Sequence, residues 1–227
     1  ASDVYKRQRF LSQNLEYHLL GNHLIENAKA LVFAGLFFKG KEANYWYQLG
    51  FSIINRELSE QVLSDGGNFE LSPMYHAIFL EDLLDLLNIH QAYDRSLPDN
   101  LENKIVQMLE WLKAMSHPDG EIAFFNDSAL DVAPSFAELL SYADRLGIAF
   151  KSNQVDRLIH LEKSGYIRVE NENMVIIADV ADIGPEYIPG HGHADALSFE
   201  LSLFGKRVIV NSGISTYEMG VDRYKQR

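Results

Sequence analysis

The sequence contains no cysteine. This absence excludes disulfides, thiolate metal sites and cysteine nucleophiles, and it leaves the cellular compartment open. The sequence also lacks any uninterrupted run of about 18 apolar residues, the length that a membrane-spanning helix needs. Its most apolar stretch, ALVFAGLFF (30–38), is bounded by Lys29 and Lys39, which is typical of a buried helix.

Basic residues are scarce, since 20 Lys and Arg stand against 32 Asp and Glu and give a formal net charge of −12. The acids are dispersed along the chain, which is typical of the solvated surface of a globular protein. A nucleic-acid ligand is disfavoured because phosphate binding requires a basic face. The net charge also weighs mildly against an anionic polymer as substrate, although a local cationic cleft would override it.

Both ends lack terminal signals. Neither an initiator Met nor a secretory pattern occurs in ASDVYKRQRF (1–10), which is polar and has no clear periodicity. The last residues, STYEMGVDRYKQR (215–227), stop without a capping signal. We therefore expect an internal fragment of a longer protein, in which part of the functional site is missing.

The first two thirds of the chain have helical periodicity. Ser72 followed by Pro73 is a strong helix start, and Ser135 with Glu138 forms a capping box at another. Short turns between consecutive helices indicate antiparallel neighbours, as in stacked helical hairpins. The predicted helices cover residues 14–38, 42–63, 72–90, 99–115 and 135–147.

After about residue 155 the apolar period changes to two. Residues 165–170 and 174–180 flank the turn NEN and predict one hairpin, and residues 197–213 predict another. Leu197, Phe199, Leu201 and Leu203 share one face of the second hairpin, which we expect to face the core. The fold class is therefore α+β, with a helical domain (1–154) followed by an antiparallel β domain (155–227).

Two histidines and an aspartate alternate in PGHGHADALSFEL (189–201). In an extended strand His191, His193 and Asp195 would project on one face, which suits a metal site or a paired acid/base site. Asn211 on the next strand is a candidate oxygen ligand, although amides are poor ligands for zinc. The alternative is a polar strand end with loosely placed histidines, which is the less favoured reading here.

Two further candidates lie on the predicted helices. Asn22 and Glu26 follow His18 at helical spacing, with His23 on the adjacent stripe. That stripe is equally well explained by hydrogen bonds to a neighbouring helix. Tyr75 lies in the first turn of its helix, where the dipole favours a phenolate by about 0.3–1 kcal/mol, whereas first-turn packing is the commoner role of a tyrosine.

The loop HPDGEIAFFNDSAL (117–130) holds Asp119, Glu121, Asn126 and Asp127. A pair of carboxylates in such a loop could serve a glycoside hydrolase. Loop acids more often form turns, and Asp119-Gly120 is a turn dipeptide, so a turn is the favoured interpretation.

Four stretches, in this order, resemble the heparinase II/III-like family of polysaccharide lyases. They are GNHLIENAKALVFAGLFF (21–38), DGGNFELSPMYHAIFLEDLLDLL (65–87), PDGEIAFFNDSA (118–129) and PGHGHADALSFELSLFGKRVIVNSGISTYE (189–218). The last stretch is long and distinctive. The resemblance implies an (α/α) toroid followed by an antiparallel β-sandwich, here with parts of both, and it implies β-elimination on a polysaccharide that contains uronic acid.

The resemblance also implies roles for individual residues. Asn22 or His23 would neutralise the uronate carboxylate, Tyr75 would be the acid and a candidate base, and His191 would be the partner base. Residues expected to bind substrate are Glu26, His76, Arg223 and Arg227. His193 would bind a structural divalent metal, commonly zinc, with Asn211 at a position where an Asp is often found; no organic cofactor is implied.

Several alternatives stay open at the level of sequence. One is a glycoside hydrolase on a helical toroid that uses Asp119 with Asp127, and another is a non-catalytic module for polysaccharide binding or biosynthesis. The polymer could be heparin or heparan sulfate, alginate or a bacterial exopolysaccharide. The resemblance favours a periplasmic or secreted protein, and a cleft between the helical and β domains would bring Tyr75 and His191 together.

Overall fold

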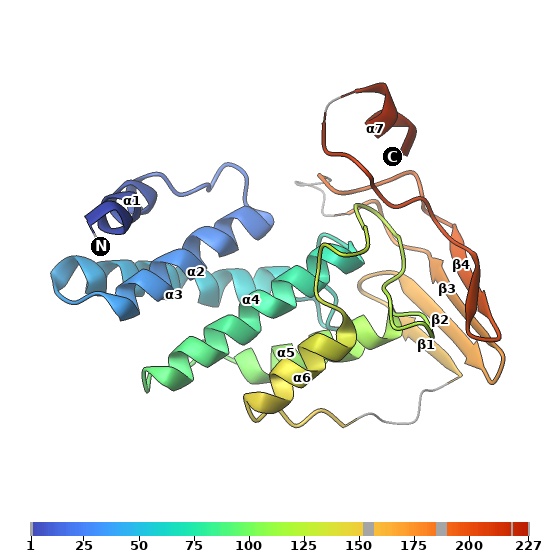
Figure 1. The fold of residues 1–227 in the computed structure, drawn as a ribbon, viewed down its shortest axis with the longest axis horizontal. Coiled ribbons are helices and arrows are strands. Elements are labelled where there is room, and N and C mark those ends of the chain that lie inside the picture. Colours follow the sequence, from blue (N-terminus) through green and yellow to red (C-terminus); the bar gives the residue numbers. More distant parts are fainter. Residues whose placement is uncertain (1, 152–156, 185–189, 219, 227) are drawn as a thin grey trace. The chain divides into compact units, whose positions relative to one another are not determined.

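The computed structural model describes residues 2–151, 157–184, 190–218 and 220–226 (Figure 1). Its helices are α1 (Ser2–Gln13), α2 (Gly21–Phe37), α3 (Lys41–Gln61), α4 (Pro73–Ala92), α5 (Leu101–Ala114), α6 (Phe136–Arg145) and α7 (Val221–Gln226). Its strands are β1 (Leu158–Leu161), β2 (Tyr166–Asn171), β3 (Met174–Asp179), β4 (Phe199–Leu203) and β5 (Lys206–Ile209). Helices α1 to α6 therefore precede the sheet along the chain, as the sequence predicts, and the short α7, which was not predicted, follows it.

The chain forms two compact units. The first contains Ala1–Gln61 and Asp82–Leu101, and the second contains Val62–Glu81 and Glu102–Arg227. Helix α4 contributes its first residues to the second unit and its remainder to the first. The division of the chain at residues 154 and 155 stays a prediction.

The first unit packs around Trp46 of α3. Its buried partners on α2 are Leu31 and Ala34, and the rings of Tyr5 and Phe38 meet Trp46 edge-on. Removal of such apolar surface from water stabilises the unit by roughly 25 cal/mol for each Å² buried. In the part of the chain that the structure describes, no helix has the length and apolar character that crossing a membrane requires.

The prediction of one helix over residues 14–38 is wrong at its beginning. The opening residues form α1, the chain then turns, and α2 begins only at Gly21 after Leu20, whose φ is 57°. Asn27 stabilises the turn, because its side chain accepts from the backbone N–H of Glu16 (3.0 Å) and donates to the Glu16 carboxylate (2.9 Å). His18 therefore lies outside the helix and does not continue the Asn22–Glu26 stripe.

Helix capping follows the predicted signals. The Ser72 hydroxyl accepts a hydrogen bond from the backbone N–H of Tyr75 (3.2 Å), so Ser72 caps α4. Ser135 and Glu138 form the predicted capping box at the start of α6. The cap contacts the backbone of Tyr75 directly, so it fixes the position of this residue in the first turn of α4.

The second unit contains a five-stranded antiparallel sheet in the order β1-β2-β3-β4-β5 (Figure 1). The two predicted hairpins are β2–β3 and β4–β5, whereas β1 was not predicted. The core beneath the sheet contains Trp111, Phe125 and Tyr166. The Tyr166 hydroxyl donates to the carbonyl of Leu71 (2.7 Å), which joins the sheet to the segment before α4.

The predicted core face of β4 is wrong. Leu197 and Phe199 are 83% and 44% exposed, whereas Glu200 and Ser202 are buried. The buried face is polar because it meets His117, which contacts the Glu200 carboxylate (2.8 Å) and the Ser202 hydroxyl (2.7 Å). A period of two identifies the two faces of a strand, but the partner that covers one of them decides which face is buried.

Candidate active site

Residues 190–198 form turns rather than the extended strand that the sequence predicts, and β4 starts only at Phe199. His193 is buried, and its backbone N–H donates to the Asn126 side chain (3.0 Å). The carboxylate of Asp195 accepts from the backbone N–H of Asn126 (2.7 Å). Asn126 therefore holds the segment that directly follows His191 through two hydrogen bonds.

Asp127 joins the two histidines. Its Oδ2 lies 2.9 Å from His191 Nδ1, and its Oδ1 lies 2.7 Å from His193 Nε2. The Asp127 side chain is fully buried, and burial opposes its ionisation. The hydrogen bonds from both imidazoles outweigh burial and lower the pKa of Asp127 to about 2, so the carboxylate is ionised at neutral pH.

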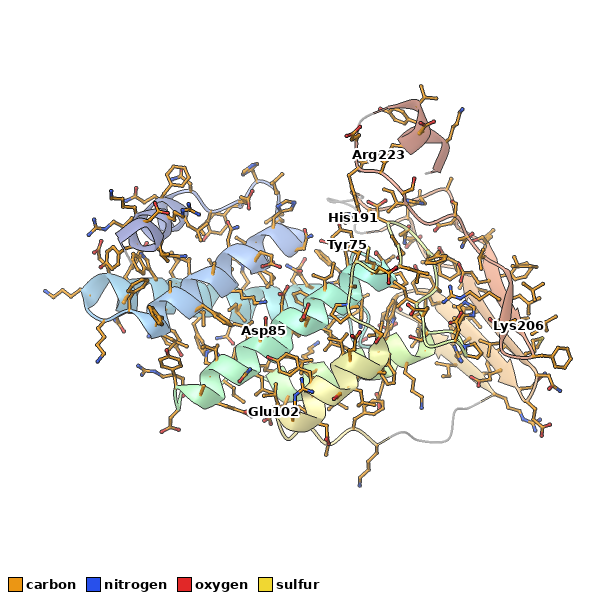
Figure 2. The ribbon with its side chains drawn as sticks, in the orientation of Figure 1. Tyr75, Asp85, Glu102, His191, Lys206 and Arg223 are labelled. Carbon is orange, nitrogen blue, oxygen red and sulfur yellow. The ribbon has the colours of Figure 1, made fainter. Side chains whose placement is uncertain are left out.

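Tyr75 and His191 lie against each other (Figure 2). Their ring centroids are 3.9 Å apart with an angle of 32° between the planes, and both residues belong to the second unit. The Tyr75 hydroxyl lies 3.2 Å from the Tyr217 hydroxyl. The structure thus brings together the two residues that the resemblance assigns to acid/base chemistry, although they are far apart in the sequence.

The phenol of Tyr75 is held protonated. Burial raises the pKa of Tyr75 above its ordinary value of 10.0, and the nearby carboxylates of Asp127 and Glu70 raise it further, against a lowering by Tyr217. The helix dipole at this position had suggested a phenolate. Burial of the Tyr75 side chain acts in the opposite direction, because it disfavours the charged phenolate.

Glu70 borders the opposite side of His191. Its Oε2 lies 3.3 Å from His191 Nε2, and the Glu70 side chain is buried. The imidazole therefore has a carboxylate near each ring nitrogen, Asp127 at Nδ1 and Glu70 at Nε2.

Arg223 supplies a cation on the Tyr217 side of the site. Its guanidinium donates to the Tyr217 carbonyl (2.8 Å) and lies 5.4 Å from the centre of the Tyr217 ring. Figure 2 labels Arg223 together with Tyr75 and His191. The other predicted arginine, Arg227, falls outside the described residues.

The predicted carboxylate neutralisers belong to the first unit. Asn22 is partly buried near the start of α2. His23 is exposed, with Nδ1 3.7 Å from the Glu16 carboxylate, and Glu26 is exposed one turn further along. The roles of all three residues stay predictions.

His76 is a residue of the core rather than of a substrate-facing surface. Its ring is fully buried and stacks on Trp111 at 4.2 Å, with Nδ1 accepting from the backbone N–H of Asn68 (3.1 Å) and Nε2 2.9 Å from the carbonyl of Met108. Burial lowers the pKa of His76 to about 3, so the ring is neutral. Its role as a substrate-binding residue stays a prediction that this geometry does not support, because both nitrogens are engaged inside the fold.

The residues predicted to bind a metal do not form a ligand set. His193 directs Nε2 to Asp127, and the Asn211 side chain donates to the Ser198 hydroxyl (3.1 Å). Among the described residues, no three His, Asp or Glu side chains are grouped as metal ligands. The structural metal stays a prediction that the geometry of these side chains does not support.

The two acids of the hydrolase alternative, Asp119 and Asp127, each have a basic side chain as hydrogen-bond partner. Asp119 is held by two hydrogen bonds from Arg207 (2.8 and 3.2 Å), and Asp127 lies between two histidines. Burial opposes ionisation of both carboxyls, but their hydrogen bonds prevail and lower both pKa values. A glycosidase acid needs a raised pKa to protonate the leaving oxygen, so this pair fits that chemistry poorly.

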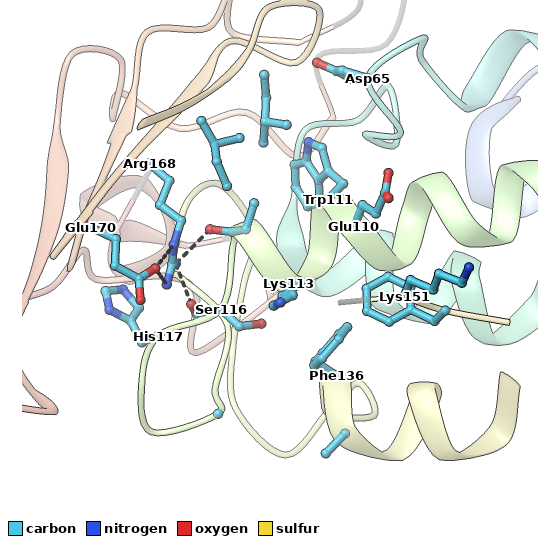
Figure 3. A pocket seen from close by; sticks show the side chains of 16 residues that line it. Asp65, Glu110, Trp111, Lys113, Ser116, His117, Phe136, Lys151, Arg168 and Glu170 are labelled. Carbon is cyan, nitrogen blue, oxygen red and sulfur yellow. Dashed lines mark hydrogen bonds and ion pairs between the residues drawn. The ribbon is translucent and has the colours of Figure 1, made fainter. Parts of the chain in front are cut away.

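A separate cavity of about 520 Å³ in the second unit is lined by Trp111, Phe136 and Arg168 among others (Figure 3). Arg168 donates to the carbonyls of Ala114 (3.0 Å) and Ser116 (2.7 Å) and pairs with Glu170. A cation on the last carbonyls of a helix stabilises that helix end. The guanidinium that faces this cavity therefore serves the fold at the end of α5.

Two family models match the chain. The model described as heparinase II/III N-terminus matches residues 1–152, and the model described as heparinase II/III-like, C-terminal matches residues 153–226. The chain belongs to the heparinase II/III family. The predicted resemblance is thereby confirmed.

Curated relatives of this heparinase II/III chain include two heparin-sulfate lyases. The protein of Bacteroides stercoris is 30% identical over 225 residues, which cover 88% of this chain and 32% of that protein. The protein of Pedobacter heparinus is 26% identical over 223 residues, which cover 87% and 32%. The chain thus spans about a third of the length of these relatives.

A crystal structure of heparinase III shares the fold. It superposes with a TM-score of 0.81 at 22% identity and covers 94% of this chain and 38% of that one. The α+β class predicted from the sequence, with toroid-type helices before an antiparallel sheet of a β-sandwich, is confirmed for this heparinase II/III chain.

Sequence reasoning missed three residues of the site. Asp127 was interpreted as a turn former, and neither Glu70 nor Tyr217 was singled out. All three fall within the stretches that resemble the family, which was the one available signal. Spacing along the chain could not reveal them, because each meets His191 or Tyr75 only through tertiary contacts.

Proposed function

We propose that the protein is a polysaccharide lyase that cleaves a uronic-acid-containing polymer by β-elimination. The observation that carries the proposal is the contact between Tyr75 and His191, 3.9 Å between ring centroids at the start of α4. A base and an acid so close together can act on two atoms of one sugar unit. Family membership and the heparin-sulfate lyases among the relatives support the same reaction class.

The reaction requires removal of a weakly acidic proton from the carbon next to the uronate carboxylate. His191 acts as the base through Nε2, because its Nδ1 is held by Asp127. Tyr75 acts as the acid that protonates the leaving glycosidic oxygen, because its raised pKa keeps the phenol protonated. Positioned acid/base groups of this kind contribute roughly 10²–10⁴-fold each to the rate.

Charge must also be stabilised as the proton leaves. Glu70 stabilises the imidazolium that forms when Nε2 of His191 accepts the proton. The developing charge on the uronate needs a donor that faces its carboxylate. Asn22 or His23 takes this role by resemblance to the family, and Arg223 near Tyr217 binds a carboxylate of the substrate.

Heparan sulfate or heparin is the first polymer to test. The relatives from Bacteroides stercoris and Pedobacter heparinus are heparin-sulfate lyases. Alginate and a bacterial exopolysaccharide are the next, since each can present a uronate to the same acid/base pair. The formal net charge of −12 makes a local cation such as Arg223 more important for capturing an anionic chain.

The decisive test is an assay of the intact protein against these polymers, read by the ultraviolet absorbance of the unsaturated uronate that only elimination produces. Tyr75→Phe keeps the ring and removes the acid, and it should lower kcat by at least about 100-fold. Tyr45→Phe, at an exposed position on α3, is the matched control and should keep wild-type activity. Cleavage without the absorbance change would instead identify a hydrolase, and binding without cleavage a non-catalytic module.

A further inference from the structure

The buried residue Asp127 contacts both histidines of the site and the residue that caps α4, the helix that carries Tyr75. Asp127 contacts His191 Nδ1 (2.9 Å) and His193 Nε2 (2.7 Å) through its two side-chain oxygens. Its backbone N–H donates to the His191 carbonyl (3.1 Å), so its main chain also holds the residue that its side chain contacts.

The other backbone group of Asp127 reaches α4. The Asp127 carbonyl accepts from the Ser72 hydroxyl (2.7 Å), and the same hydroxyl caps α4 by accepting from the N–H of Tyr75 (3.2 Å). Asp127 therefore contacts His191 and His193 directly and is connected to Tyr75 through the Ser72 hydroxyl. These contacts come from three separate parts of the sequence, and a displacement at Asp127 would move the acid and the base relative to each other.

The chemistry of the contact also fixes the tautomer of the imidazole. An ionised carboxylate can only accept hydrogen bonds, so each contacting ring nitrogen must carry a proton. His191 then carries hydrogen on the Nδ1 that faces Asp127, as in other carboxylate–histidine pairs. Its Nε2 lies at ion-pair distance, 3.3 Å, from Glu70 Oε2 and provides the lone pair of the neutral ring. His193 donates from Nε2 to the other carboxylate oxygen of Asp127, and this second hydrogen bond keeps the carboxylate from rotating.

We propose that Asp127 is a positioning residue, which fixes the orientation of His191 and the Nδ1–H tautomer, so that Nε2 is the nitrogen that acts as the base. The inference deepens the proposed function, on which its catalytic consequence rests. Asp127 itself does not touch the substrate, since its side chain is fully enclosed between the imidazoles.

The substitution Asp127→Asn tests the proposal with almost no change of shape. An amide has one accepting oxygen and one donating nitrogen, so one of the two imidazoles must present a lone pair in place of a proton. We expect kcat to fall by about 10- to 100-fold or more, with KM changed far less. Asp119→Asn is the matched control in the same loop, because its partner is Arg207 and not a histidine.

A second measurement needs no substrate. Nuclear magnetic resonance of protein with isotope-labelled histidine reports which ring nitrogen carries hydrogen, and His191→Asn assigns the signals of His191. The expected result is hydrogen on Nδ1 of His191 in the wild type and its loss or redistribution in Asp127→Asn. Absence of hydrogen on Nδ1 in the wild type would overturn the proposal, as would wild-type kcat in a folded Asp127→Asn protein.

The two measurements also separate this inference from the proposed function. If the wild type releases no unsaturated uronate from any polymer, the lyase proposal fails, but the tautomer of His191 still decides the role of Asp127. If the wild type is active and His191 carries hydrogen only on Nε2, the positioning role fails and the lyase proposal stands.

Discussion

His117 and Glu200 form a fully buried pair in which the imidazole Nε2 lies 2.8 Å from the carboxylate Oε2. The other carboxylate oxygen accepts from the backbone N–H groups of Phe124 and Asn211, each at 2.9 Å. This pair therefore ties the loop after α5 to β4 and β5. The loop that it anchors continues to Asp127, so the pair supports the site from a distance.

Replacing one member of this pair should destabilise the second unit strongly. Glu200→Gln keeps the shape but weakens the contact with His117. His117→Ala removes the side chain that lies 2.8 Å from Glu200 Oε2 and leaves that oxygen buried, 3.8 Å from the Arg207 guanidinium. Breaking a buried pair from one side costs about 3–5 kcal/mol of unfolding free energy, so we expect His117→Ala near that range and Glu200→Gln below it. Denaturant unfolding measures the loss. The control is Asp119→Asn, which breaks the exposed ion pair with Arg207 and should cost under about 1 kcal/mol of unfolding free energy.

Asp179 should make stability depend on pH. Burial raises the pKa of this carboxyl from 3.8 to about 7, and the neighbouring Asp195 carboxylate adds to the rise. The unfolded chain releases the Asp179 proton near pH 4 and the folded chain only near pH 7. The contribution of Asp179 to the unfolding free energy therefore falls as pH rises through this window and is level outside it.

Asp179→Asn removes this titration and keeps an acceptor for the backbone N–H of Ala181 (2.8 Å). We expect the variant to gain on the order of 1–3 kcal/mol over the wild type above pH 7 and little below pH 4. Thermal unfolding at a series of pH values measures the difference. An equal effect of the substitution at all pH values would contradict the prediction.

Lys29 pairs with two carboxylates of α4 in the first unit, of which Asp82 is buried and Asp85 is partly exposed. Its ammonium lies 2.7 Å from the Asp82 carboxylate and 2.6 Å from that of Asp85. Burial raises the pKa of Asp82 to about 7 even in the presence of this cation. Lys29→Met leaves the carboxylates facing each other, and we expect a loss of about 2–4 kcal/mol at neutral pH that shrinks as acid protonates Asp82. Lys41→Met, at an exposed position of α3, is the control and should have little effect at either pH.

Tyr217→Phe should weaken the proposed acid without removing it. The Tyr217 hydroxyl lies 3.2 Å from that of Tyr75 and lowers the pKa of Tyr75, in opposition to burial. Its loss raises that pKa further, so the alkaline limb of the rate profile should move to higher pH and kcat should fall by about 10-fold. Tyr224→Phe, exposed on α7, should leave the profile unchanged; an unshifted limb in Tyr217→Phe would contradict the prediction.

Local rules predicted much of the fold, because they depend on neighbouring residues. The cap at Ser72, the capping box at Ser135 and the two hairpins are all as expected, since each is a contact between residues a few positions apart. The helix predicted over residues 14–38 failed because Asn27 binds back to Glu16.

The sequence by itself determined that a helical part precedes an antiparallel β part, the family resemblance, and the candidacy of Tyr75 and His191 as chemical groups. Only the tertiary structure decided that Asp127 holds both histidines, that Glu70 and Tyr217 border the pair, and that β4 buries its polar face against His117. Periodicity and capping are properties of a single segment, whereas these contacts join segments more than 60 residues apart and follow from how the whole unit packs.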